Sequence, residues 1–342
     1  MEMIRPLSIV ERERLQSMLK DPQDKTPSFE EYLTEQRFSN GRVCPICGGT
    51  HVQRNGRRKS GTQKFICKDC GKTFSIGKNT IFNGTRKNMS VWMEYLECMA
   101  EGLSIPKSAE RCGISERTSF SWRHKILDAI GESKNGIGLS GIVEADETFV
   151  PVSYKGNRTK FCDGSVERKQ RTRGGENHKR GLSDELVCIP CAIDRNGNAL
   201  SRVAKLGKCS AEAVGKVFDG HIDKKSTLCT DEEASYRKFS RGNGNTLVQI
   251  KGGKKTIKGI YHIQHLNAFH SKLKLFLARF KGVSSKYLNN YLTWNSTVEH
   301  MAGTIKEKVA AMLRHIVSAI FEETCLSLPQ RTCLPVLVKN QS

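Results

Sequence analysis

The chain has 342 residues, and its 56 Lys and Arg residues outnumber 35 Asp and Glu residues, which gives a formal net charge of +21. This length predicts two or three folded units, and the excess of positive charge favours a polyanionic partner, with nucleic acid as the first candidate. No apolar stretch approaches the length of a membrane span, and residues 1–19 mix Arg with Glu, which argues against a membrane protein and against a secretion signal.

Residues 1–40 are predicted to form a short helical segment, and residues 41–80 a compact module that contains cysteine pairs. Two C-x2-C pairs, separated by 19 residues, are formed by Cys44, Cys47, Cys67 and Cys70. Each pair can form a tight knuckle that directs two thiolates toward one point, and a glycine follows each pair. Because cysteine fills all four positions, the pattern predicts one structural Zn²⁺ ion without an open coordination site. Two redox-active pairs are the alternative.

Residues 86–132 are predicted to form a helix-turn-helix. Ala109 is small enough for two helices to cross closely, Gly113 can adopt the positive φ that the turn needs, and Ser115 can cap the second helix. Polar side chains of the second helix are predicted to be exposed and to contact DNA, namely Arg117, Ser119 and Arg123. A plain helical hairpin with a packing role is the alternative.

From residue 140 to residue 295 the pattern changes to strands that alternate with helices. Strands are predicted at residues 142–152, 186–194, 199–204, 227–230 and 246–250, and helices at residues 211–218 and 263–280. The segment Arg195-Asn-Gly-Asn198 is a hairpin turn signal between the second and third strands. These elements predict a mixed α/β sheet with flanking helices, and residues 296–342 are predicted to form a C-terminal helical tail.

Two aspartates are candidate metal ligands in this segment. Asp146 lies on an alternating strand, and Asp231 directly follows the short apolar strand 227–230. The carboxyl end of a parallel strand is where ligands bind, so the fold can bring these two carboxylates together. Such a pair can hold two divalent ions for an in-line phosphoryl displacement. The alternative for either aspartate is an ordinary cap or turn residue.

Between Tyr154 and Gly181 the chain has nine Lys or Arg residues and three acidic residues. This basic stretch is predicted to contact the DNA backbone. Its candidate residues are Lys155, Arg158, Arg171, Arg173, Lys179 and Arg180. A solvated loop is the alternative.

Three further groups contain chemistry-bearing residues. Glu144 shares the strand face of Asp146 and is interpreted as a structural neighbour rather than a ligand. Cys188 and Cys191 form another C-x2-C pair, but its strand setting argues against a second zinc site. His262 and His265 lie close together in the sequence and are interpreted as hydrogen-bonding residues, with a further zinc site as the alternative.

Together these features resemble the bacterial insertion-sequence transposases that carry a zinc ribbon and a ribonuclease-H-like DDE domain, the ISXO-like group. The resemblance covers about residues 42–294, and it depends on the combination of blocks rather than on any one block. The blocks are the four cysteines, Glu144-Ala-Asp-Glu-Thr148, Arg180-Gly-Leu-Ser183, Ile193-Asp-Arg195, Thr230-Asp231, and the segments His265–Lys274 and Phe280–Trp294.

The resemblance implies a ribonuclease-H-like catalytic domain in which Asp146 and Asp231 are the first two ligands of two Mg²⁺ or Mn²⁺ ions. The third ligand of the family is normally a glutamate on a later helix, but here that helix carries Asn267, 36 positions after Asp231, and no acid. Asn267 is the first candidate and His270 the second. An amide oxygen has no charge, which predicts weaker metal binding. Subgroups of the family are similar in carrying Asn there with a later lysine, here Lys274, which can hold a phosphate.

The sequence therefore predicts an insertion-sequence transposase that cleaves 3′ ends at terminal inverted repeats and joins them to target DNA. Synapsis of two ends predicts a homodimer or larger assembly on DNA, located in the bacterial cytoplasm at the nucleoid. The alternative from a different class is a domesticated, non-catalytic DNA-binding regulator that keeps the ribbon and the helix-turn-helix. A nuclease of the same fold, which would cut DNA without joining it, is a further alternative.

Overall fold

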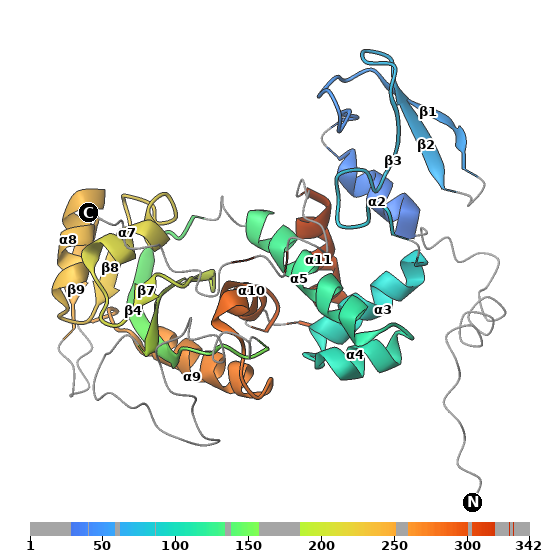
Figure 1. Ribbon diagram of the computed structural model, residues 1–342. Helices are drawn as coiled ribbons and strands as arrows, with labels where there is room; N and C mark the ends of the chain where they lie inside the picture. Colours follow the sequence, from blue (N-terminus) through green and yellow to red (C-terminus); the bar gives the residue numbers. More distant parts are fainter. Residues whose placement is uncertain are drawn as a thin grey trace, which may run out of the picture. The chain divides into compact units, whose positions relative to one another are not determined.

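The computed structural model describes residues 29–39, 41–58, 62–85, 87–133, 138–156, 185–250, 259–299, 303–318, 328 and 331. The chain divides into two compact units, Met1–Ala129 with Gly303–Glu323 and Ile130–Ala302 with Thr324–Ser342. Each unit is therefore formed from two separate stretches of the sequence. Figure 1 labels the helices and strands of both units.

The first unit begins with helix α2 (Phe29–Arg37) and a three-stranded antiparallel sheet. Its strands are β1 (Val52–Arg57), β2 (Gln63–Cys67) and β3 (Thr73–Ser75). Phe65 of β2 and Phe74 of β3 are register partners, both are buried, and their rings stack with centroids 5.8 Å apart. A module with so small a core needs another source of stability, such as a bound metal ion.

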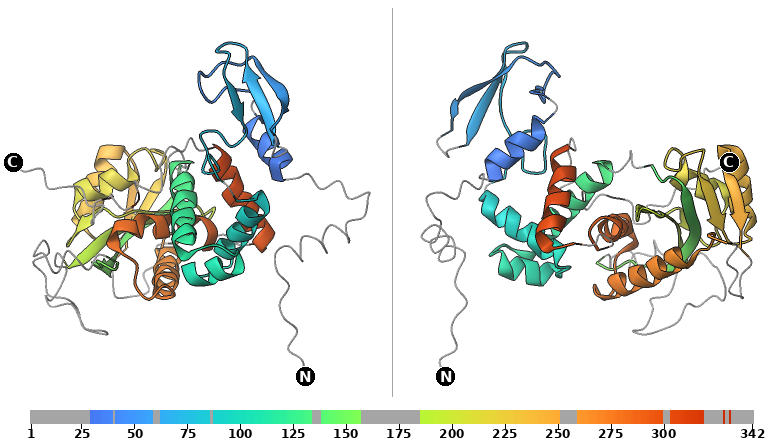
Figure 2. Two further views of the ribbon diagram at one scale, coloured as in Figure 1. Left: turned by 45° about the vertical axis from the view of Figure 1, so that its right-hand side comes forward. Right: turned by 180° about the vertical axis from the view of Figure 1, so that it is seen from behind.

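The described residues of the first unit also form α3 (Met89–Ala100), α4 (Ile105–Arg111), most of α5 (Glu116–Ser133) and α11 (Ile305–Ser318). Trp92 of α3 stacks on Trp122 of α5 with ring centroids 3.6 Å apart, and both side chains are buried. Helix α11 packs against α3 and α2, as Figure 2 shows in dark red. The helix of the C-terminal tail thus belongs to the same unit as the predicted helix-turn-helix.

The second unit is built on a six-stranded mixed sheet. Its strands are β4 (Ile142–Pro151), β5 (Leu186–Asp194), β6 (Ala199–Ser201), β7 (Lys205–Leu206), β8 (Thr227–Thr230) and β9 (Thr246–Gln249). They follow the order β6-β5-β4-β8-β9, with β7 beside β5. Strand β5 is antiparallel to β4 and β6, whereas β8 is parallel to β4 and to β9. Strand β4 is therefore central and joins the antiparallel and parallel halves.

Helices cover both faces of this sheet (Figures 1 and 2). Val143 and Ala145 of β4 face a core formed with α7 (Ala211–Phe218) and α8 (Ala234–Asn243). On the other face, β5 packs against α9 (Gln264–Ala278) and α10 (Leu288–Trp294). Because strand side chains alternate, residues 144 and 146 of β4 lie on the α9 face.

The predicted fold class, a mixed α/β sheet with flanking helices behind a four-cysteine ribbon and helices, is confirmed. The predicted hairpin between β5 and β6 is present, with Gly197 at a φ of +84°. Helix α8 was not predicted, because only Tyr236, Phe239 and Ser240 of its ten residues are buried. In the described part of the chain, no helix has the length and apolar character needed to cross a membrane.

Candidate functional site

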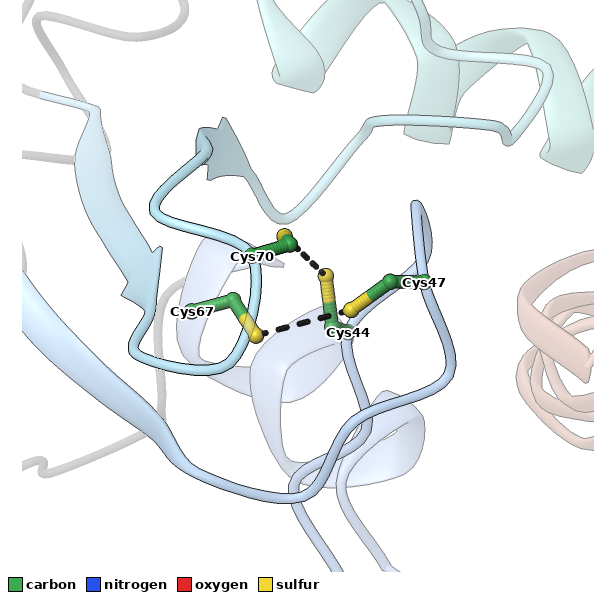
Figure 3. A group of neighbouring side chains, drawn as sticks. All are labelled: Cys44, Cys47, Cys67 and Cys70. Carbon is green, nitrogen blue, oxygen red and sulfur yellow. Dashed lines mark hydrogen bonds between the residues drawn. The ribbon is translucent and has the colours of Figure 1, made fainter.

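The four predicted zinc ligands converge on one point of the first unit (Figure 3). The sulfur atoms all lie within 4.8 Å of one another, with 3.9 Å between Cys44 and Cys70 and 3.7 Å between Cys47 and Cys67. A tetrahedron with Zn–S bonds of about 2.3 Å has edges of about 3.8 Å, so the donor set fits one Zn²⁺ ion. A fully cysteine-coordinated ion has no open position, which makes the site structural.

Neighbouring groups hold the two knuckles of this ribbon together. Asp69 Oδ1 lies 2.6 Å from His51 Nδ1, and Asp69 Oδ2 accepts the backbone N–H of His51 at 3.3 Å. A Cβ atom at Gly49 would lie only 2.1 Å from Asp69 Oδ2, so a larger residue here would displace the Asp69 side chain. Arg37 of α2 donates to the carbonyl oxygens of Ile76 and Lys78, which ties the helix to the ribbon.

The helix-turn-helix has the local features predicted from the sequence. Ala109 is buried at 4% exposure, Gly113 in the turn has a φ of +58°, and Ser115 Oγ accepts the N–H of Thr118 at 3.2 Å. Arg117 is exposed at the start of α5. This side chain is therefore available for a DNA contact.

Two other predicted DNA contacts on α5 are wrong about exposure. Ser119 and Arg123 are both fully buried. Ser119 Oγ donates to the carbonyl of Ile105 at 3.0 Å, and Arg123 Nη2 donates to the carbonyl of Leu103 at 2.7 Å. The reason is that α5 packs within the helical unit over more than one face, so these polar groups join α5 to the segment around α4.

In the second unit, Asp146 lies within β4, and Asp231 directly follows the last residue of the neighbouring strand β8. Ala145 of β4 is the register partner of Thr230 of β8, and the two aspartates are the residues that follow these partners in the chain. Neighbouring strands are about 4.8 Å apart, so the two backbones are close at this point. Strand alternation places Asp146 on the α9 face. The charge of Asp231 is among the causes that raise the pKa of Asp146, so the two carboxyl groups lie near each other.

The surroundings of this pair disfavour negative charge. Burial, followed by the charges of Asp231 and Glu147, raises the pKa of Asp146 to about 7. Burial also raises the pKa of Asp231 and that of Glu147. Glu147 lies on the opposite face, where its Oε2 accepts a hydrogen bond from the hydroxyl of Tyr236 at 2.9 Å. Like charges that cannot easily ionise together are typical of sites that bind a cation or a shared proton.

Helix α9 carries the three remaining catalytic candidates. Asn267 and Lys274 are exposed, whereas His270 is buried at 9% exposure. Burial, followed by the charge of Lys274, lowers the pKa of His270 to about 4, so its imidazole is neutral near pH 7. Among the described residues, His270 Nε2 has no hydrogen-bond partner.

An ionic cluster around the buried Glu144, which we call the Glu144 cluster, lies where β4 meets the start of α9. It consists of Glu144, Arg195, His262 and His265. Glu144 Oε1 is 2.7 Å from His265 Nδ1 and 3.0 Å from Arg195 Nη1, while Oε2 accepts the N–H of Leu266 at 3.0 Å. The sequence alone indicated a structural role for Glu144. It could not identify these partners, because they lie between 51 and 122 positions away in the chain.

The remaining basic candidates have different outcomes. Lys155 Nζ donates to the carbonyls of Phe280 and Gly282, both at 2.9 Å, and lies 3.4 Å from that of Lys281. Lys155 is exposed, and its ammonium group binds the carbonyls that follow α9, so its DNA contact stays a prediction. The other candidates of the basic stretch, Arg158, Arg171, Arg173, Lys179 and Arg180, lie outside the described residues.

The extra cysteine pair on β5 cannot share a metal ion. Cys188 packs in the core on the α7 face and Cys191 in the core on the α9 face. Residues three apart on a strand point to opposite sides of the sheet. These thiols are core residues.

Comparisons with known proteins match both parts of the chain. Residues 138–294 match the family model of the ISXO2-like transposase domain, and residues 28–73 match that of the transposase zinc-ribbon domain. An uncharacterized protein in transposable element ISH50 of Halobacterium salinarum is 22% identical over 262 residues, which are 76% of this chain and 86% of that protein. Both domain families imply binding to DNA.

Proposed function

We propose that this chain, whose ISXO2-like transposase domain and transposase zinc ribbon indicate an insertion-sequence transposase, cleaves 3′ ends at terminal inverted repeats and transfers them to target DNA. The observation that carries this proposal is the register of β4 and β8. Ala145 pairs with Thr230 in that register, and Asp146 and Asp231 are the residues that directly follow these two partners. Both reactions are phosphoryl transfers that need no covalent protein intermediate.

The carboxylate pair fits Mg²⁺ or Mn²⁺, which prefer hard oxygen ligands. Burial and mutual repulsion penalise the ionised form of Asp146, as its raised pKa reflects, and a divalent cation held between the carboxylates removes that penalty. Two such ions supply activation of the attacking oxygen and stabilisation of the leaving oxygen. Asp146 and Asp231 are the residues that would hold them, and the pairing of β4 with β8 keeps their backbones close together.

We assign Asn267 as the third ligand, with His270 as the alternative. Asn267 directly follows Leu266, whose N–H is bound by Glu144 on the face of Asp146. The neutral imidazole of His270 keeps a lone pair near pH 7, so it can bind a metal ion or a proton donor. Lys274 is seven residues after Asn267, hence on the same helix face, and is assigned to a DNA phosphate.

The other segments are assigned by their chemistry. The ribbon of residues 41–80 and the helix-turn-helix of residues 86–132, with Arg117 exposed, bind the element ends, and residues 140–295 catalyse. The flanking segments 1–40 and 296–342 contribute α2 and α11, which pack together in the first unit. Two ends must be held during joining, so the active form is at least a homodimer on DNA at the nucleoid.

The test is a cleavage and joining assay on labelled DNA that carries the terminal repeats of the element, with Mg²⁺ or Mn²⁺. The variants are Asp146→Ala, Asp231→Ala, Asn267→Ala and His270→Ala, with the exposed Asp219→Ala as a matched control. Loss of an aspartate ligand is expected to lower the rates of cleavage and joining by more than about 100-fold. This is a larger effect than the loss of a residue that only supports a metal ligand. The control should retain both reactions.

Each outcome assigns a different function. Full activity of Asp146→Ala or Asp231→Ala would refute the proposed site. Binding of the repeats without cleavage by the wild type would favour the non-catalytic regulator, and cleavage without joining would favour the nuclease. A loss in His270→Ala with an unchanged Asn267→Ala would move the third ligand to His270.

A further inference from the structure

The Glu144 cluster is a buried carboxylate that joins three separate parts of the second unit. Glu144 is 1% exposed on the central strand β4. Arg195 comes from the turn between β5 and β6, and His265 and Leu266 come from the first turn of α9. A buried carboxylate is costly unless it is paired and hydrogen-bonded, and both oxygens of Glu144 have such partners.

Glu144 also replaces a missing cap at the start of α9. The N-cap residue of this helix, Ile263, makes no side-chain cap hydrogen bond, and the first turn contains no acidic residue. The free N–H of Leu266 is instead accepted by Glu144 Oε2 at 3.0 Å. A carboxylate at a helix N-terminus also interacts favourably with the helix dipole. The start of α9 is therefore fixed by a residue of β4, not by its own sequence.

Arg195 extends this attachment to the segment before the helix. Its Nη1 lies 2.6 Å from His265 Nδ1 and 3.1 Å from His262 Nε2, and its Nη2 donates to the carbonyl of Ile260 at 3.0 Å. The carboxylate and the two imidazoles lie close enough together to hold a metal ion. However, the Arg195 guanidinium contacts all three, and its positive charge favours an ionic clamp over a metal site at this position.

The clamp lies next to the proposed catalytic pair. Glu144 and Asp146 are two residues apart on one strand face, which is about 6.7 Å along the strand. Asn267 follows Leu266, the residue whose N–H the clamp binds. Any shift in this hydrogen bond would move the first turn of α9 relative to Asp146.

We propose that Glu144 is a positioning residue, which through Leu266, His265 and Arg195 holds Asn267 at the Asp146–Asp231 pair. This inference rests on the proposed function, because the Glu144 cluster is given the role of positioning a ligand of the proposed catalytic site. Glu144 itself does not contact the reacting DNA. Its role is to set the distance between Asn267 and the aspartate pair. An uncharged ligand attracts the cation only weakly, so this attraction cannot by itself bring α9 into position.

The experiment uses Fe²⁺ with ascorbate and peroxide on the full chain, since Fe²⁺ bound in place of Mg²⁺ cuts the backbone near its site. The wild-type backbone should be cut at three positions, near Asp146, near Asp231 and near Asn267. In Glu144→Gln, which keeps an acceptor for Leu266 but loses the charge, the cut near Asn267 should weaken severalfold relative to the strand cuts. Glu144→Ala should lose it, and the exposed Glu212→Gln should match wild type.

Kinetics provide a second readout that a general loss of stability would not give. Glu144→Gln should lower kcat for cleavage by about 10- to 100-fold, as for outer-shell residues, and leave KM for the DNA unchanged. If Glu144→Ala does not fold, His265→Ala, on the exposed side of the cluster, gives the same test. An unchanged cut near Asn267 together with an unchanged kcat would overturn the positioning role.

Failure of the proposed function looks different. Wild type without cuts near Asp146 and Asp231 would overturn the catalytic metal site and, with it, the inference. Cuts around His262 that persist in Asp146→Ala and Asp231→Ala would show that the Glu144 cluster binds the metal itself, and would also overturn the clamp.

Discussion

The raised pKa of Asp146 predicts that the proposed catalytic site destabilises the metal-free protein. Below pH 3.8 this carboxyl is protonated in both the folded and the unfolded chain, so it makes no difference to stability. Between pH 3.8 and about 7 the unfolded chain releases a proton that the folded chain retains, so the free energy of unfolding falls as the pH rises. Above about pH 7 the full penalty is present.

The size of this penalty follows from the pKa. The rise in the pKa of Asp146 from 3.8 to about 7 corresponds to about 4 kcal/mol, at about 1.36 kcal/mol for each pH unit. Asp146 is only partly buried and solvent screens part of this energy, so we expect Asp146→Asn to raise the free energy of unfolding by about 2 kcal/mol at pH 8. At pH 4 the gain should nearly vanish. The same substitution should abolish DNA cleavage.

The assay is urea unfolding in buffer without added Mg²⁺ or Mn²⁺. No chelator is used, so the zinc ribbon keeps its own ion. Trp294 is buried in the second unit, while Trp92 and Trp122 lie in the first, so a Trp92→Phe, Trp122→Phe background reports on the second unit by fluorescence. Asp194→Asn is the matched control. Its carboxylate accepts hydrogen bonds in the β5–β6 turn, so this variant should lose stability.

Two results would refute this reasoning. The first is an Asp146→Asn variant that is no more stable than the parent at pH 8. The second is a gain of equal size at pH 4 and pH 8, which would show that the effect does not come from ionisation. Addition of Mg²⁺ should stabilise the parent and not the variant, because only the parent keeps both carboxylates.

Three further predictions concern residues outside the carboxylate pair. Gly49→Ala should lower the retained zinc per chain, measured by a colorimetric chelator, because its Cβ would overlap Asp69 Oδ2; undiminished zinc would contradict this effect of the overlap. Arg117→Ala should weaken DNA binding in a salt-titrated gel shift without a change in Tm, whereas Arg123→Ala should lower the Tm first; the reverse pattern would restore Arg123 as the DNA contact. Lys155→Ala should lower the Tm of the second unit through lost hydrogen bonds to the carbonyls of Phe280 and Gly282, and an unchanged Tm would contradict this stabilising role.

Local features of the sequence sufficed for much of the fold. Helix α7 and strand β8 have the predicted bounds, because a short apolar run or an amphipathic helix is determined by neighbours in the chain. The C-x2-C spacing likewise predicted the four-cysteine cluster, since each knuckle is formed within a few residues. Helix α8 escaped prediction, because its few apolar residues meet a partner only in the folded core.

The exposure of the Ser119 and Arg123 side chains on α5 depends on helix packing, which cannot be read from the sequence. Ser119 and Arg123 are polar, and polarity indicated an exposed face. Their hydrogen bonds to carbonyls near α4 bury them instead, which only the arrangement of the helices reveals.

The sequence by itself identified Asp146 and Asp231 as candidate ligands, because each lies in or directly after a strand with a readable pattern. Only the tertiary structure decided that parallel pairing of β4 with β8 brings them near each other. It also decided that Glu144, through Leu266, holds the start of the helix that carries Asn267. The physical reason is that strand register and ionic pairing join residues more than 80 positions apart, and no local pattern encodes such contacts.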